Sequence, residues 1–256
     1  MLQMCKFIDV EQNSDEWFEL RAGRLTSSKL GVVMASPRDY MVCEMAKNDY
    51  VIINLSTKKP IKGRYQDKFS AENALNLIKK SDLTKSFGAP AKQYAVNIAI
   101  EQITGEPIPS AFTNAHMERG HEQEPIAREL YENNTFSDVT NGGFYDCGFI
   151  GCSPDGMVYD DGVIEIKSVI ASVQFANVKR GAVDPAYYWQ CVGNLKFTGR
   201  QWLDFISYSS EFPVDRQLFV HRIYAADLAA EFDKIDTRVD EFKKLVAQSK
   251  EIILNS

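Results

Sequence analysis

A tight turn between two short apolar runs constrains the fold of this chain most strongly. The runs are residues 157–159 and 163–167, and Asp-Asp-Gly occupies positions 160–162 between them. An Asp-Gly pair flanked by apolar runs is typical of a β-hairpin. Because side chains alternate across a strand, Glu165 and Lys167 share one face of the second run, and the two isoleucines beside them face the core.

The hairpin brings Asp155, which precedes its first strand, close to the level of Glu165. Two carboxylates suit Mg²⁺, a hard cation that needs only a few protein oxygens beside water and phosphate. A bound divalent ion polarises a phosphoryl group and lowers the pKa of a coordinated water from about 15.7 toward neutrality. Lys167 can orient that water or offset charge on the phosphoryl oxygens. The pattern predicts metal-assisted hydrolysis of a phosphodiester; the alternative is a surface hairpin with one ion pair.

The composition sets the broad class of protein. The chain has 256 residues, of which 45% are hydrophobic, enough for one large core or for one domain with an insertion. That apolar fraction argues against a disordered chain. No run of about eighteen apolar residues is present, so no membrane span is expected. The N-terminal residues lack the apolar core of a secretory signal.

The cysteines and histidines are scattered along the chain. The five cysteines form no CxxC pair, and the three histidines are not paired at ligand spacing. An odd number of widely spaced cysteines argues against a disulfide framework and against a zinc knuckle. A reducing cytoplasm is therefore the expected setting. The cysteines are Cys5, Cys43, Cys147, Cys152 and Cys191.

The net charge of −6 opposes nucleic-acid binding by the chain as a whole. Nucleic-acid enzymes usually carry a positive footprint, so a focused cationic channel is required here. One basic segment, residues 58–65, is expected to be a loop. It is either a solvated surface turn or an arm that grips DNA.

Periodicity and turn residues predict an α/β (α+β) chain in which helices flank a central mixed sheet. Helices are expected at 15–21, 29–34, 71–80, 92–103, 114–133, 184–197 and 227–254, and strands within 140–159 and at 163–169, 202–208 and 217–224.

The hydroxyls of residues 26–28 offer N-caps for the second helix and a possible anion site. In the helix at 114–133, Glu124 shares a stripe with Ala127 and Tyr131. It is either a surface carboxylate at the core boundary or part of a site. Pro125 marks the first turn of that helix or kinks it.

These motifs resemble the lambda exonuclease and YqaJ group of phage-recombinase nucleases, in the restriction-endonuclease-like PD-(D/E)xK superfamily. The resemblance covers most of the chain. Residues 17–28 match a W-x-x-L-R-x-G-x-x-T-x-S element, residues 120–128 match a helix that carries a glutamate, and residues 152–156 with Glu165 and Lys167 match the nuclease core. Lambda-type members of the family have a much shorter link at the position of residues 39–91. The chain is therefore expected to be a single nuclease domain, 1–256, with an insertion at about 39–91.

The resemblance implies roles for residues of this chain. Catalysis is assigned to Glu124, Asp155, Glu165 and Lys167, and metal binding to Asp155, Glu165, Glu124 and the backbone carbonyl of Ile166. Contacts with DNA, including a pocket for a terminal 5′-phosphate, are assigned to Arg21, Ser28, Arg38, Ser153 and Gln190. A nuclease that contacts only the DNA backbone has no sequence to read. A pocket for a terminal phosphate would give it another means of discrimination.

The resemblance further implies a Mg²⁺-dependent exodeoxyribonuclease, with Mn²⁺ as a possible substitute. It would digest one strand of linear duplex DNA in the 5′-to-3′ direction from a 5′-phosphorylated end. Its partners would be double-stranded DNA ends and a single-strand annealing protein, its assembly a trimeric ring, and its setting the cytoplasm of a bacterium carrying a phage or prophage. The alternatives are a sequence- or structure-specific endonuclease of the same fold and a non-catalytic DNA-binding protein. An iron–sulfur nuclease is disfavoured because the cysteines are not grouped.

Overall fold

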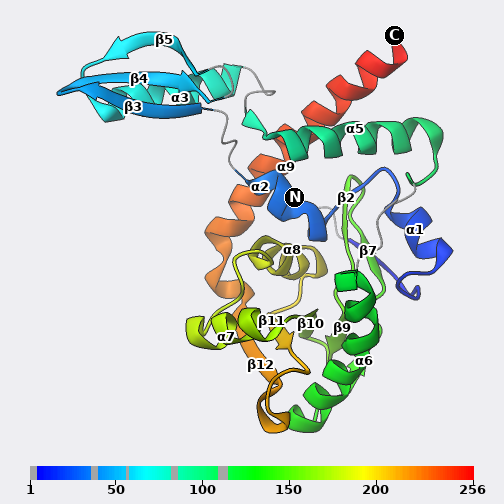
Figure 1. Cartoon of the computed structure of the whole chain (residues 1–256). Coiled ribbons are helices and arrows are strands. Elements are labelled where there is room, and N and C mark those ends of the chain that lie inside the picture. The colour runs from blue at the N-terminus through cyan, green and yellow to red at the C-terminus, as the bar shows by residue number, and fades with distance from the viewer. Residues whose placement is uncertain (1–4, 36–39, 56–57, 82–85, 109–114) are drawn as a thin grey trace. The chain divides into compact units, whose positions relative to one another are not determined.

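The computed structural model describes residues 5–35, 40–55, 58–81, 86–108 and 115–256. The predicted DNA-contacting residue Arg38 lies outside these residues. The chain divides into two compact units (Figure 1). Unit 1 comprises Met1–Gly31 and Ile100–Thr237, and unit 2 comprises Val32–Ala99 and Arg238–Ser256. The expected insertion at about 39–91 falls within unit 2, and the single-domain organisation stays a prediction.

Unit 1 is built on a five-stranded mixed sheet with the order β12-β11-β10-β9-β6. β10 pairs in parallel with β11, and the other neighbours are antiparallel. The predicted hairpin is confirmed, since Val158 lies opposite Gly162 in the β9–β10 pair. The strands are β6 (Val139–Thr140), β9 (Gly156–Val158), β10 (Gly162–Ser168), β11 (Trp202–Tyr208) and β12 (Leu218–Tyr224).

A second sheet of unit 1 has the order β1-β7-β8-β2. Its strands are β1 (Lys6–Ile8), β2 (Leu25–Thr26), β7 (Phe144–Asp146) and β8 (Ile150–Cys152). The pairing of β1 with β7 sets Lys6 opposite Asp146, and the adjoining residues Cys5 and Cys147 form a disulfide. The prediction against disulfides is therefore wrong for this pair. The two cysteines are 142 residues apart in the sequence, and only the strand register brings them together.

The helices of unit 1 cover both faces of the five-stranded sheet. Ala127 and Tyr131 of α6 pack against Ile164 and Ile166 of β10, so the predicted stripe and the buried isoleucine face are confirmed. α8 carries Asn194, which bonds to Glu165 on the opposite face of β10. The helices are α1 (Asp15–Arg21), α6 (Ala115–Thr135), α7 (Ala171–Arg180) and α8 (Tyr188–Thr198), with 3-10 turns at Ser27–Lys29, Val214–Arg216 and Ala225–Asp227. The short helix α2 (Leu30–Met34) contributes residues to both units.

Two details of these helices differ from expectation. α7 was not predicted, although Gly181 ends it in the left-handed conformation that glycine favours. Pro125 lies well inside α6 rather than in its first turn. No helix among the described residues has the length and apolar character to cross a bilayer.

Unit 2 contains a three-stranded antiparallel sheet, β3-β4-β5, and the helix α3 that packs on it. The basic segment predicted as a loop is instead mostly strand β5, which pairs with β4 through two irregularities in register. α5 (Ala89–Thr104) and α9 (Ala229–Leu254) each contribute residues to both units. The remaining elements are β3 (Tyr40–Ala46), β4 (Asp49–Asn54), β5 (Lys59–Tyr65) and α3 (Lys68–Ser81).

Candidate active site

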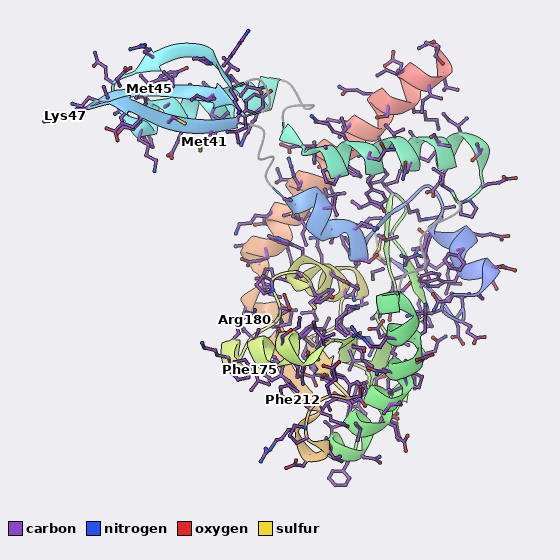
Figure 2. The ribbon with its side chains drawn as sticks, in the orientation of Figure 1. Met41, Met45, Lys47, Phe175, Arg180 and Phe212 are labelled. Atoms are coloured by element: carbon purple, nitrogen blue, oxygen red, sulfur yellow. A yellow bond between two sulfur atoms is a disulfide. The ribbon has the colours of Figure 1, made fainter. Side chains whose placement is uncertain are left out.

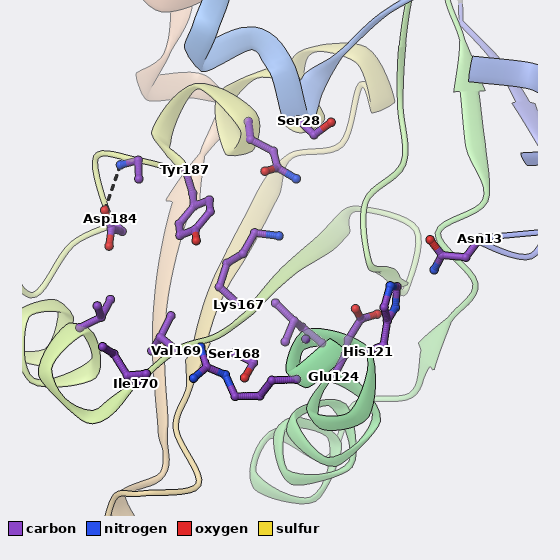
Figure 3. A pocket seen from close by; sticks show the side chains of 16 residues that line it. Asn13, Ser28, His121, Glu124, Lys167, Ser168, Val169, Ile170, Asp184 and Tyr187 are labelled. Atoms are coloured by element: carbon purple, nitrogen blue, oxygen red, sulfur yellow. Dashed lines mark hydrogen bonds between the residues drawn. The ribbon is translucent and has the colours of Figure 1, made fainter. Parts of the chain in front are cut away.

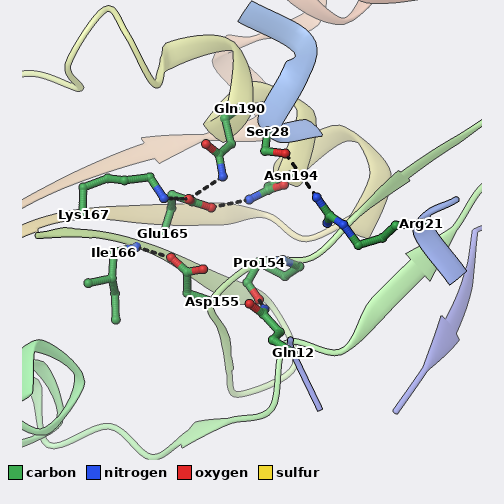
Figure 4. Close-up of polar contacts among 10 residues, drawn as sticks. All are labelled: Gln12, Arg21, Ser28, Pro154, Asp155, Glu165, Ile166, Lys167, Gln190 and Asn194. Carbon is green, nitrogen blue, oxygen red and sulfur yellow. Dashed lines mark hydrogen bonds and ion pairs between the residues drawn. The ribbon is translucent and has the colours of Figure 1, made fainter. Parts of the chain in front are cut away.

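Asp155 is fixed at the start of the β9–β10 hairpin by backbone contacts with the second strand. Its own N–H donates to the carbonyl of Ile164, with an N···O distance of 3.1 Å. The N–H of Ile166 donates to Asp155 Oδ2 at 2.6 Å (Figure 4). Asp155 is 9% exposed, so little water solvates its carboxylate. The residue lies at the level of Glu165, as the sequence predicts.

Glu165 is fully buried and accepts hydrogen bonds from three side chains. Lys167 Nζ and Gln190 Nε2 both donate to Glu165 Oε1, and Asn194 Nδ2 donates to Oε2 at 2.7 Å (Figure 4). A buried carboxylate is costly unless such donors compensate for the lost water. Gln190 and Asn194 both come from α8, four residues apart, so they reach the carboxylate from adjacent turns of one helix.

Two carboxyl groups at this site hold their protons unusually strongly. Burial, reinforced by the charge of Asp155, raises the pKa of Glu165 to about 8, although Lys167 opposes the shift. Burial and the same aspartate raise the pKa of Glu124 to about 7, against the effects of Lys167 and Arg128. Carboxylates that raise one another's pKa are close enough to concentrate negative charge, which favours a bound cation.

Lys167 remains charged in this setting. Burial lowers its pKa, but the charges of Glu165 and Asp155 outweigh burial and raise the pKa above its ordinary value. The Lys167 side chain is 22% exposed, and Nζ lies 5.3 Å from the centre of the Tyr187 ring. Its ammonium group therefore reaches from the buried carboxylate toward the open side of the site.

The site offers two carboxylates and one carbonyl, rather than three acidic side chains, to a divalent cation. Among the described residues, no three acidic, histidine or cysteine side chains form a group that could hold a metal ion. Asp155 and Glu165, with the neighbouring carbonyl of Ile166, still match Mg²⁺, which often takes one or two carboxylates and completes its shell with water and phosphate. The addition of Glu124 to that set stays a prediction.

An open pocket of about 720 Å³ extends from this group of residues. Glu124 of α6, Ile166 and Lys167 of β10, Gln190 of α8 and Ser28 line it (Figure 3). Four of the residues assigned from sequence to catalysis or DNA binding therefore share one cavity with Ile166, which was assigned to metal binding. His121 and Tyr187 also line the pocket, and sequence reasoning gave neither a role.

A second polar cluster links three of the predicted phosphate-binding residues. The guanidinium of Arg21 stacks on Trp17, with Cζ 3.9 Å from the ring centre, and Arg21 Nη2 lies 3.4 Å from Ser28 Oγ (Figure 4). Trp17 Nε1 donates to Ser153 Oγ at 2.9 Å. Trp17 thus joins Arg21 to Ser153, which follows β8.

Two expectations for this region can be compared with the structure. The hydroxyls of Thr26 and Ser28 lie 3.1 Å apart and share a hydrogen bond, and Thr26 makes no side-chain cap of the 3-10 turn Ser27–Lys29. Gln190 bonds to Glu165, and the DNA contact assigned to it stays a prediction. Asn194 was missed altogether. Its spacing of four residues from Gln190 was the available signal.

The metal-free protein is expected to lose thermal stability as pH rises from about 5 to above 8. The pKa of Glu165 rises from 4.5 to about 8 in the fold, so the folded state binds this proton more tightly than the unfolded state. The stabilisation is present below pH 4.5 and is lost as pH passes 8. We expect the melting temperature, measured by calorimetry in EDTA, to fall by roughly 5 °C or more.

Glu165→Gln should flatten this pH dependence. The amide carries no charge, and Asn194 Oδ1, which has no hydrogen-bond partner among the described residues, can accept from it after rotation of the Asn194 amide. Glu122→Gln, on the exposed side of α6, is the matched control and should leave the slope unchanged. An equal slope in wild type and Glu165→Gln would contradict the assignment to Glu165.

Comparison with known proteins agrees with the sequence. Residues 16–201 match the model of the YqaJ-like viral recombinase domain, which confirms the resemblance found from the motifs. No curated protein matches the chain.

Among solved structures, an alkaline exonuclease from Laribacter hongkongensis is 27% identical, with a TM-score of 0.62, over 94% of this chain and 99% of its own. Its complex with dAMP is 28% identical over the same shares, with a TM-score of 0.63. A phage-related exonuclease from Haemophilus somnus 129PT is 16% identical, with a TM-score of 0.55, and covers 93% of this chain and 99% of its own. The last match supports the fold alone.

Proposed function

Because the chain belongs to the YqaJ-like viral recombinase domain family, we propose that it is a divalent-metal-dependent exodeoxyribonuclease. The observation that carries the proposal is the group formed by Asp155, Glu165 and Lys167, in which Lys167 bonds to the buried Glu165 and also lines an open pocket. A buried carboxylate held beside a charged lysine is unfavourable as a purely structural device. It suits a site that holds a cation and a phosphodiester.

The chain's own residues would position the reactants. Asp155, Glu165 and the carbonyl of Ile166 would hold Mg²⁺ or Mn²⁺, and Glu124 would complete the site from α6. The ion would supply polarisation of the scissile phosphate and a water of lowered pKa. Lys167 would hold the attacking water and offset charge on the phosphoryl oxygens. Gln190 and Asn194 would keep the Glu165 carboxylate oriented.

The second polar cluster would recognise the end of the DNA. Arg21, fixed by stacking on Trp17, presents its fork beside Ser28, and Ser153 is tied to the same tryptophan. An arginine fork with hydroxyl donors is well suited to a terminal phosphate dianion. We propose that this cluster selects 5′-phosphorylated ends and so sets 5′-to-3′ digestion. The dAMP complex of the Laribacter enzyme holds a mononucleotide, the product class expected from such a reaction.

A time course on linear duplex DNA tests the function. With Mg²⁺, we expect a 5′ label to be released at once and a 3′ label on the same strand to persist until the strand is nearly consumed. EDTA should abolish digestion, and a covalently closed plasmid should remain intact. Cleavage of the closed plasmid would instead identify an endonuclease. Binding without cleavage in either Mg²⁺ or Mn²⁺ would identify a non-catalytic DNA-binding protein.

Membership of the family supports a proposal about the biological setting. We propose that the enzyme prepares single strands for a single-strand annealing protein during phage-type recombination in a bacterial cytoplasm. A trimeric ring around the DNA is part of the same proposal. Light scattering on the purified protein gives the mass of the assembly directly.

A further inference from the structure

The sheet of unit 2 and its helix form a basic module in an acidic protein. We define this sheet module as β3, β4, β5 and α3, residues 40–81. It contains eight lysines and arginines and only four aspartates and glutamates. The whole chain has the opposite balance, 29 basic residues against 35 acidic ones. The positive footprint that a DNA enzyme requires is therefore concentrated in this segment.

Most acidic groups of the sheet module are already engaged. Asp49 pairs with Arg64 at 2.7 Å, and Glu72 lies 3.7 Å from the ammonium of Lys68. Asp67 accepts from the N–H of Ser70 near the start of α3 at 2.8 Å. These contacts leave the excess positive charge on other side chains.

Three lysines of the sheet module are exposed and make no ion pair among the described residues: Lys47, Lys58 and Lys59. Lys47 lies in the turn between β3 and β4, and Lys58 lies in the connection between β4 and β5. In an antiparallel meander these two connections are at opposite ends of the sheet. The ammonium groups of these lysines therefore lie at both ends of the sheet.

One face of the sheet is partly exposed between these lysines. Ile52 is fully buried and α3, with its buried Ala71 and Leu75, contacts all three strands. On the face opposite Ile52, Val51 of β4 is also buried, but β3 is exposed. Met41 and its cross-strand partner Ile53 point to the other face. Met41 is 48% exposed and lies on β3 along with Met45 (Figure 2).

The character of this face favours duplex over single-stranded DNA. Single-strand binders stack bases on exposed aromatic rings. Among the described residues of the sheet module, Phe69 is the large aromatic side chain that is strongly exposed, and it belongs to α3 rather than to the strands. Paired strands fit the major groove, where apolar side chains contact thymine methyl groups and flanking lysines contact phosphates.

We propose that the sheet module is a second contact for duplex DNA, in addition to the catalytic pocket. The proposal rests on the proposed function, because duplex DNA is the substrate assigned to the pocket. Lys47, Lys58 and Lys59 bind backbone phosphates, and the exposed methionines of β3 lie against the groove. Lysine and proline on β5 also protect a sheet edge from aggregation. That role does not account for the lysines in the two connections.

The test compares two double variants that remove the same charge. Lys58→Ala/Lys59→Ala changes the sheet module, and Lys244→Ala/Lys250→Ala changes α9. Both are made in full-length protein carrying Lys167→Ala, which prevents cleavage. The measurement is fluorescence anisotropy in Ca²⁺ with a duplex closed by a hairpin at each end, so that no terminal phosphate takes part. A single strand of the same length is titrated in parallel.

We expect the sheet-module variant to bind the closed duplex roughly tenfold more weakly at 0.1 M salt, with a log–log salt slope shallower by about two. The α9 variant should match its parent. Equal losses in both variants, an unchanged affinity, or a loss confined to the single strand would each overturn the proposal. Because binding is read without turnover, failure here is distinct from failure of the nuclease assignment, which is read from cleavage by the otherwise wild-type enzyme.

Discussion

Lys167→Ala is expected to reduce cleavage of linear duplex DNA by roughly 10²–10⁴-fold, the range typical for loss of a positioned acid–base or electrostatic group. Its ammonium group bonds to Glu165 and lies over the Tyr187 ring beside the pocket. It is thus placed to contact the attacking water or the phosphoryl oxygens. DNA binding in Ca²⁺ should survive, because the carboxylates and the Arg21 cluster remain. Single-turnover cleavage and anisotropy measure the two effects separately.

Two further variants make this result specific to the lysine charge. Lys167→Gln keeps an N–H donor near Glu165 but removes the charge, and it should be as inactive as the alanine variant. Lys244→Ala removes an exposed lysine of α9 and should retain full turnover. Melting curves exclude misfolding as the cause. Wild-type turnover in Lys167→Ala, or full activity in Lys167→Gln, would reject the role given to this ammonium group.

The sequence predicted the part of the site that depends on local geometry. Glu165 and Lys167 are two residues apart on one strand, so their shared face follows from strand alternation alone. The turn at 160–162 then fixed the position of Asp155 through the hairpin. These relations need no knowledge of the rest of the fold, and the structure confirms them.

The features missed from the sequence depend on contacts between distant segments. Asn194 acquires its role only because α8 packs on the face of β10 that carries Glu165. Cys5 meets Cys147 because β1 pairs with β7. β5 was predicted as a loop because Pro60, Gly63 and several charges give it low strand propensity. Its pairing with β4 overrides that propensity.

Arg21→Ala is expected to slow digestion from 5′-phosphorylated ends by roughly 10–100-fold, and from 5′-hydroxyl ends far less. The estimate corresponds to the loss of one charge-assisted hydrogen-bonded contact, about 1.5–3 kcal/mol. Arg21 stacks on Trp17 and lies beside Ser28, which lines the same pocket as Lys167. Initial rates on two otherwise identical duplexes, one phosphorylated and one not, give the ratio directly.

Arg21→Lys separates charge from geometry. Lysine keeps the positive charge but loses the planar fork and much of the stacking on Trp17, so we expect it to restore only part of the preference for phosphorylated ends. Arg216→Ala, an exposed arginine in the turn before β12, is the control and should leave both rates unchanged. If Arg21→Ala slows both kinds of end equally, the arginine positions DNA in general and the terminal phosphate must be recognised by another group. The cluster would then not explain how an enzyme that reads no base sequence selects an end.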